Sequence, residues 1–231
     1  ITDGKNSPHN LSVGAQLGII YKNFDPNHFT FDSQFSADAP GGFDPNISNG
    51  EIWWKTSLLK IDANMGVFYK YQKEDWKAHP WAGFSVYHMP RPNQSMTKLV
   101  KDKLPMRWVM EAGADYQIND NINLTPMLLY MMQAKAHEIN IGAICFYHLK
   151  DTKYDIIGGV SCRIKDAIIL QTGLKYEEHI FTLSYDINTS YLSNYTGGRG
   201  AFEFSISLTG FKGQPLFSPK FNRAKNLNKS L

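Results

Sequence analysis

The sequence predicts an all-β protein, specifically an antiparallel up-and-down transmembrane β-barrel of the outer-membrane type with about eleven strands. Three observations predict this class. Apolar and polar residues alternate along most of the chain, the alternating segments are long, and aromatic residues make up 13% of the 231 residues while charged residues make up only 19%. Alternation puts all apolar side chains on one face of a strand. A strand of about ten residues is long enough to cross a bilayer when tilted.

The alternation is clearest near the two ends of the chain. Residues 199–210 place Phe202, Phe204, Ile206 and Leu208 on one face and polar residues on the other. The same test predicts strands at 10–22, 61–70, 107–116, 122–132 and 179–187, and more weakly at 28–35, 79–89, 137–148, 154–163 and 167–176. The apolar face therefore recurs from strand to strand.

The apolar face is predicted to contact lipid. Trp108 and Tyr116 lie on this face eight residues apart, roughly 27 Å along a strand, which is the spacing expected of two aromatic girdles. We therefore expect Phe202, Phe204, Ile206, Leu208, Trp108 and Tyr116 to face the bilayer. The alternative is a soluble lipocalin-like barrel whose apolar face points inward.

Loop lengths predict which ends of the strands lie together. The predicted long connections, 36–59, 89–105 and 188–200, all follow even-numbered strands in an eleven-strand count, so they share one rim. Bacterial barrels of this kind have an even number of strands and begin and end in the periplasm. An eleven-strand count then requires an odd number of further strands. We therefore expect residues 1–210 to be the C-terminal part of a larger barrel, incomplete at its N-terminus.

Charge and cysteine usage exclude several classes. The net charge of +3 is too small to indicate nucleic-acid binding, and no apolar run is long enough for a transmembrane helix. In a hairpin around residue 151, Cys145 is expected to face about residue 157 and Cys162 about residue 140. No disulfide between them is expected.

The sequence carries no recognisable catalytic or cofactor motif, so we expect no enzyme activity, no cofactor and no metal. His137 and Glu138 lack a second histidine four residues after the first, which a zinc protease would need. The glycine-rich stretch 196–202 leads into a strand and not into a phosphate-binding helix. Oxygen-bearing side chains in the second long connection do not match a calcium-loop spacing; they are Asp38, Asp44, Asn46, Asn49 and Glu51.

The polar face of the predicted strands carries charges of both signs. These residues are Lys70, Arg107, Glu111, Asp115, Arg163, Lys175, Asp186 and Glu203. Opposite charges in a lumen are expected to pair, which favours a scaffold over an open general porin. Residues 211–231 break the alternation and contain five Lys or Arg and no acid. We expect a basic periplasmic tail, either disordered or docked on an acidic partner.

Three stretches resemble the PorP/SprF family of type IX secretion proteins. They are "FTFDSQFSADAPGGFDPNISNGE" at 29–51, "MRWVMEAGADYQINDNINLTPMLL" at 106–129, and "FTLSYDINTSYLSNYTGGRGAFEFSISL" at 181–208. The resemblance covers about residues 10–210. It implies an outer-membrane barrel of a Gram-negative bacterium that works with periplasmic or lipoprotein components of the secretion apparatus. It also implies that the barrel holds a large secreted surface protein, such as a gliding adhesin, by its C-terminal domain.

Three classes of function follow. The first is a non-enzymatic anchor or export partner, the second is a diffusion or uptake channel, and the third is a soluble ligand-binding barrel. For the anchor, the long loops of the outer rim are the expected contact surface. Tyr191, Tyr195 and Arg199 are the expected contacts, because Tyr and Arg are enriched at binding hot spots.

Overall fold

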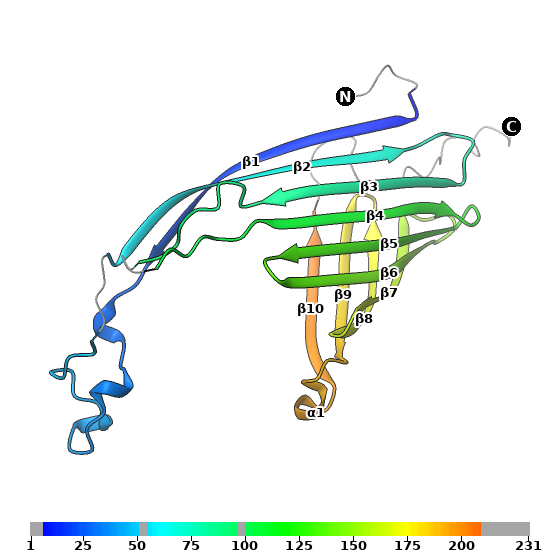
Figure 1. Cartoon of the computed structure of the whole chain (residues 1–231). Helices are drawn as coiled ribbons and strands as arrows, with labels where there is room; N and C mark the ends of the chain where they lie inside the picture. Colours follow the sequence, from blue (N-terminus) through cyan, green and yellow to red (C-terminus); the bar gives the residue numbers. More distant parts are fainter. Residues whose placement is uncertain (1–6, 51–54, 97–99, 209–231) are drawn as a thin grey trace, which may run out of the picture.

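The computed structural model describes residues 7–50, 55–96 and 100–208. Within these ranges the chain forms one antiparallel sheet of ten strands, in which each strand pairs with its neighbours in sequence (Figure 1). The strands are β1 (His9–Asn23), β2 (Ser57–Tyr71), β3 (Ala78–Tyr87), β4 (Arg107–Gln117), β5 (Ile122–Gln133), β6 (Ala136–His148), β7 (Tyr154–Arg163), β8 (Ala167–Tyr176), β9 (His179–Asn188) and β10 (Arg199–Ser207). The all-β antiparallel meander expected from the alternation is therefore present.

The strand predicted at 28–35 is wrong. The chain here forms the 3-10 turn Asp32–Gln34, and two further 3-10 turns, Pro26–His28 and Pro40–Gly42, lie on either side of it. Proline fixes its own φ and lacks a donor, while neighbouring Asp and Asn side chains bond to nearby backbone, so the local turn chemistry prevails over a short alternation. Gly41 and Gly42 both have positive φ, of 80° and 79°, which reverses the chain there.

The structure has ten strands and not eleven, so the long connections follow different strands from those predicted. The long connections follow β1, β3 and β9, which are all odd-numbered strands, so they still share one rim of the sheet. We call this the loop rim, and the opposite end the turn rim. Ten strands also place the start of β1 and the end of β10 at the turn rim. The inference of an odd number of further strands rested on the count of eleven and does not hold.

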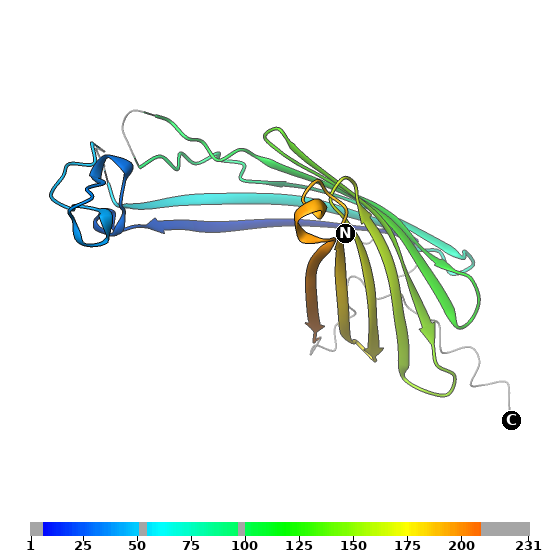
Figure 2. The ribbon, with the colours of Figure 1, turned by 90° about the horizontal axis from the view of Figure 1, so that it is seen from below.

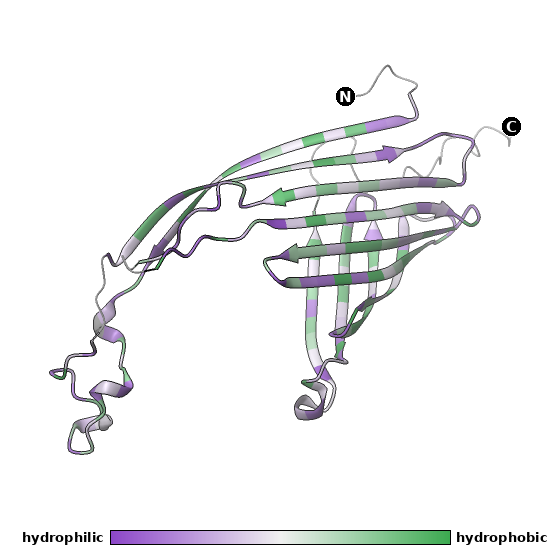
Figure 3. Ribbon diagram, in the orientation of Figure 1, coloured by the Kyte–Doolittle hydropathy of each residue, from purple (hydrophilic) through white to green (hydrophobic). Residues whose placement is uncertain are grey.

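The register joins the apolar faces of all ten strands into one continuous surface. Val13 pairs with Val67 between β1 and β2, and Leu183 pairs with Phe204 between β9 and β10. Intermediate strands follow the same rule, and Figure 3 shows the alternating hydropathy along each of them. A shift of one residue at any pairing would have moved an apolar set to the other face.

Buried side chains gather on the opposite, mixed face of the sheet. Every strand residue that the described structure buries lies there: Leu58, Asp62, Lys70, Asn123, Asp155, Ile157, Ala167 and Lys175. The sheet is strongly curved (Figures 1 and 2), and side chains on the inside of a curved sheet cover one another. The mixed face is therefore concave and the apolar face convex, the reverse of the lipocalin-like alternative.

The sheet remains open in this structure. β1 and β10 are its two edges and no pairing between them is present in the described residues. No described helix has both the length and the apolar character needed to cross a membrane.

The first hairpin extends beyond the rest of the sheet. β1 and β2 pair along their whole length, from His9 with Tyr71 to Asn23 with Ser57, whereas β2 and β3 pair only from Met65 to Lys70. The outer part of the hairpin therefore projects from the loop rim as a two-stranded arm, which carries residues 24–50 at its tip (Figure 2).

Candidate functional site

The concave face is crossed by ion pairs close to the turn rim. Lys70 of β2 donates to Asp115 of β4 over 2.6 Å between Nζ and Oδ2, and Thr125 of β5 donates to the other carboxylate oxygen over 3.0 Å. The side chains of Lys70 and Asp115 are only 10% and 15% exposed. The pairing expected for mixed charges on this face is thus present for these two residues.

A second cluster at the turn rim includes residues that the sequence did not single out. His148 of β6 lies 2.6 Å from Asp155 of β7, measured from Nδ1 to Oδ1, and Lys175 of β8 approaches the other oxygen at 4.0 Å. Alternation places both Asp155 and His148 on the polar face, so the sequence was sufficient to identify them as candidates. Their side chains are mostly buried, so this cluster fixes three adjacent strands at one height.

Acids also surround Arg163 at the loop-rim end of β7. Its guanidinium lies 2.7 Å from Asp166, 3.5 Å from Asp186 and 3.5 Å from Glu138. Asp186 was expected on this face. Glu138, treated as an ordinary strand residue in the sequence, acts here as a partner of Arg163.

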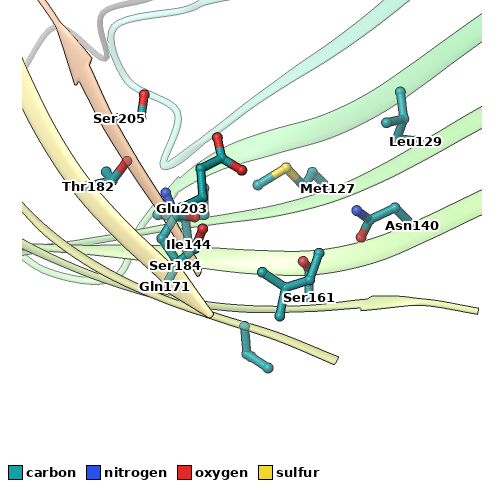
Figure 4. A pocket seen from close by; sticks show the side chains of 12 residues that line it. Met127, Leu129, Asn140, Ile144, Ser161, Gln171, Thr182, Ser184, Glu203 and Ser205 are labelled. Carbon is teal, nitrogen blue, oxygen red and sulfur yellow. The ribbon is translucent and has the colours of Figure 1, made fainter. Parts of the chain in front are cut away.

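A cavity of about 350 Å³ lies on the concave side of β5 to β10 (Figure 4). Its lining combines apolar side chains with hydroxyl, amide and carboxylate groups: Met127, Leu129, Asn140, Ile144, Val160, Ser161, Ile169, Gln171, Thr182, Ser184, Glu203 and Ser205. Glu203 is the one ionisable residue in this lining. The lining contains no histidine or cysteine, so its serines have no adjacent imidazole base.

The predicted contact residues lie at the loop rim. Tyr191 and Tyr195 are 83% and 82% exposed and belong to the connection between β9 and β10, which contains the short helix α1 (Ser193–Thr196). Arg199 is exposed and begins β10. Asn188 and Gly198 bond through their backbones at 3.1 Å and close the connection. The two tyrosines therefore project from a loop whose ends are joined by a hydrogen bond.

Residues 24–50, which we call the loop cap, form a folded unit at the tip of the arm. Gln34 is 7% exposed and stands at its centre. Its Oε1 accepts from the Phe31 N–H at 3.1 Å, and its Nε2 donates to the Ile47 carbonyl at 3.0 Å. Phe35 and Phe43 form a β-bridge with their rings edge to face. A buried amide that is hydrogen-bonded through both its oxygen and its nitrogen holds the two halves of the cap together.

The oxygen-bearing residues of this connection do not gather around a common point. Asp44 accepts from both the backbone and side-chain nitrogens of Asn46 at 2.9 Å, which is turn geometry. Glu51 lies outside the described residues. Among those described, no group of three His, Cys, Asp or Glu side chains is placed to hold a metal ion.

The family model for the type IX secretion system membrane protein PorP/SprF matches residues 5–208, which includes the whole sheet. The chain belongs to the PorP/SprF family. Neither the curated proteins nor the solved structures contain a significant match to it.

In this PorP/SprF chain the residues expected to face lipid all lie on the convex apolar face. Phe202, Phe204, Ile206 and Leu208 are well exposed at the β10 edge. Trp108 is half-buried because its ring packs against Phe84, with centroids 5.8 Å apart. Tyr116 belongs to a row of tyrosines on this face near the turn rim, and the sequence alone did not predict the row. Its members are Tyr69, Tyr116, Tyr147, Tyr154 and Tyr176.

The two cysteines are separate, as expected. Cys145 pairs with Gly158 and Cys162 with Ile141, one residue away from the positions predicted for each. Both are free thiols. The small error arises because the turn after β6 is centred slightly later than residue 151.

Proposed function

We propose that this protein is a non-enzymatic outer-membrane barrel of the type IX secretion system that holds an exported surface protein at the cell surface. The observation that carries the proposal is the pair of opposed faces: a convex apolar face, with large apolar side chains exposed on every strand except β3, and a concave face of paired charges. An apolar face of this size needs an apolar solvent.

A bilayer supplies that solvent. The row of tyrosines near the turn rim supports this orientation, because amphipathic rings favour the membrane–water interface. The rings of Tyr154 and Tyr176 contact each other within the row, tilted by 34° with centroids 4.9 Å apart. The backbone edges of β1 and β10 support a closed state in lipid, since unpaired N–H and C=O groups are costly there. The edges would pair with each other or with further strands.

The loop rim is the proposed contact surface for the exported protein. The connections at the turn rim are short, whereas the loop rim carries the loop cap, the connection from β3 to β4 and the exposed tyrosines. An interface of about 800 Å² per partner needs the larger area of the loop rim. The basic segment 211–231 lies outside the described residues, and we propose that it faces the periplasm and other secretion components.

The test replaces both exposed tyrosines, Tyr191→Ser and Tyr195→Ser, in cells. The matched control is Ile118→Ser, an exposed apolar residue in a turn-rim connection. After folding is checked by heat-modifiable migration, proteins on washed cells and in the medium are quantified by mass spectrometry. We expect surface proteins to move to the medium in the tyrosine variant and not in the control. Unchanged retention in a folded variant would remove this loop from the mechanism.

A diffusion channel is the competing function. The ion pairs on the concave face argue against it, because they join β2 to β4 and β7 to β8 on the face that solutes would pass. The purified protein in a planar bilayer is expected to conduct little without its partner. Large, stable single-channel steps would favour the channel.

A further inference from the structure

The loop cap contains a hollow of about 340 Å³. All the residues that line it belong to the cap, so it is separate from both faces of the sheet. Both copies of the sequence Phe-Asp-Pro-Asn, at 24–27 and 43–46, contribute to its walls. The lining is Pro26, Phe29, Thr30, Gln34, Phe43, Asp44, Pro45, Ile47, Ser48 and Asn49. This volume is near the lower limit for ligand pockets, so it suits one or two side chains of an extended segment.

The hollow is held open by contacts within the cap. The Gln34 side chain bridges Phe31 and Ile47, and the Gln34 carbonyl accepts from the Asp44 N–H at 2.9 Å. Phe29 packs against Phe24 with centroids 5.6 Å apart. Since these contacts fix both halves of the cap, the hollow forms before any partner arrives, and less ordering free energy is lost on binding.

The surroundings of the hollow are acidic. Residues 24–50 contain Asp25, Asp32, Asp38 and Asp44 and no Lys or Arg, although the whole chain has a net charge of +3. Asp25 pairs with His28, and Asp44 caps its own turn. Asp32 and Asp38 are exposed. Their carboxylates would attract a cationic segment and repel an anionic one.

The position of the cap leaves the hollow accessible. The arm carries it beyond the end of β3, and the Phe29 and Ile47 side chains on its wall are 45% and 38% exposed. Apolar walls within an acidic surface favour an occupant that offers an apolar side chain and positive charge together.

We propose that this hollow binds an extended polypeptide segment that carries an aromatic or aliphatic side chain next to Lys or Arg. The apolar side chain enters between the two Phe-Asp-Pro-Asn turns, and the cation lies near Asp32 and Asp38. This inference rests on the proposed function, under which the segment belongs to the exported protein. The cap then adds a second contact to the one at Tyr191 and Tyr195.

The test measures peptide binding to the full chain, refolded in a neutral detergent, by calorimetry at low salt. Three probes are compared: Gly-Lys-Phe-Leu-Arg-Gly, its charge-reversed form Gly-Glu-Phe-Leu-Glu-Gly, and Gly-Lys-Gly-Ser-Arg-Gly, which lacks the apolar pair. We expect the first probe to bind about tenfold more tightly than either other probe, because each of the others loses one of the two complementary features.

Variants locate the binding. Asp32→Asn with Asp38→Asn should weaken the first probe about fivefold and reduce its salt dependence. Ile47→Ser should weaken it at any salt concentration. Asp120→Asn with Asp151→Asn, two exposed acids at the turn rim, is the matched control and should change nothing. Equal binding of all three probes, or equal binding by the cap variants and the control, would overturn the proposal.

The result of the peptide-binding experiment can be distinguished from the result of the surface-retention experiment that tests the proposed function. Loss of surface retention in the tyrosine variant, without discrimination among the probes, would leave the anchor and remove the hollow. Probe discrimination that depends on the cap, with retention unchanged in the tyrosine variant, would support the hollow and count against the contact at Tyr191 and Tyr195.

Discussion

Lys70 and Asp115 form an ion pair of 2.6 Å although β3 runs between their strands. The two side chains meet above β3 on the concave face, where Lys70 pairs by register with Trp81 and Asp115 with His79. Strong curvature brings side chains of next-nearest strands together on the inside. The pair therefore depends on the curvature of the sheet as well as on its register.

Removing one member of this pair should destabilise the protein. Lys70→Met leaves the Asp115 carboxylate mostly buried without its cation, and we expect a loss of about 3 kcal/mol in the free energy of unfolding. The double variant Lys70→Met with Asp115→Leu should recover most of this loss. Guanidinium unfolding in lipid vesicles measures both.

The exposed pair of Lys153 and Glu177 provides the control for that experiment. Lys153→Met should cost under about 1 kcal/mol because solvent screens the pair. Similar losses for Lys70→Met and Lys153→Met would show that the concave face is as well solvated as the rim.

Phe204→Arg should prevent stable insertion into a bilayer. Phe204 lies in mid-strand on the convex face, opposite Leu183, and Arg at the membrane midplane costs roughly 2 to 4 kcal/mol. Ser205 lines the concave cavity, so Ser205→Arg should reduce insertion less than Phe204→Arg. Heat-modifiable folding in vesicles compares the two. Equal folding would reverse the assignment of faces.

Gly200→Ala should destabilise the last hairpin. A Cβ at this position would lie 2.0 Å from the Asp186 carbonyl oxygen, next to the β-bulge between Arg199 and Phe202. Backbone must move, and we expect a loss of about 1 to 3 kcal/mol. Gly158→Ala is the control, since a Cβ there meets no atom within 4 Å. Unfolding midpoints that shift equally would contradict the bulge geometry.

Ile141→Cys should form a disulfide with Cys162. The two positions are direct partners in the register of β6 and β7. A disulfide needs Cβ atoms about 3.5 to 4.5 Å apart, which is reached at the near end of the spacing of directly opposite residues. Mild oxidation followed by non-reducing mass spectrometry detects the bond. The native chain is the control, because Cys145 faces Gly158 and should remain a thiol. A bond between Cys145 and Cys162 instead would show a different register.

The local alternation in the sequence determined most of the strands. The weaker alternation at 154–163 and 167–176 still predicts both ends of β7 and β8, because a slip of one residue would move every side chain to the other face. The failure at 28–35 has a local cause. A short alternating run flanked by Asp-Pro-Asn turns has no partner strand, and alternation stabilises a strand only when a neighbour supplies hydrogen bonds.

Sequence alone also determined that one face is apolar and the other carries charges of both signs, since side-chain direction in a strand follows from residue parity. Tertiary structure decided which face is concave, because curvature is a property of the whole sheet and not of any one strand. It also decided the partners of Asp155 and Arg163, which lie on other strands of the sheet: His148 and Glu138 on β6 and Asp186 on β9. The hollow of the loop cap likewise required folding, because two separate Asp-Pro-Asn turns form its walls only after Gln34 joins them.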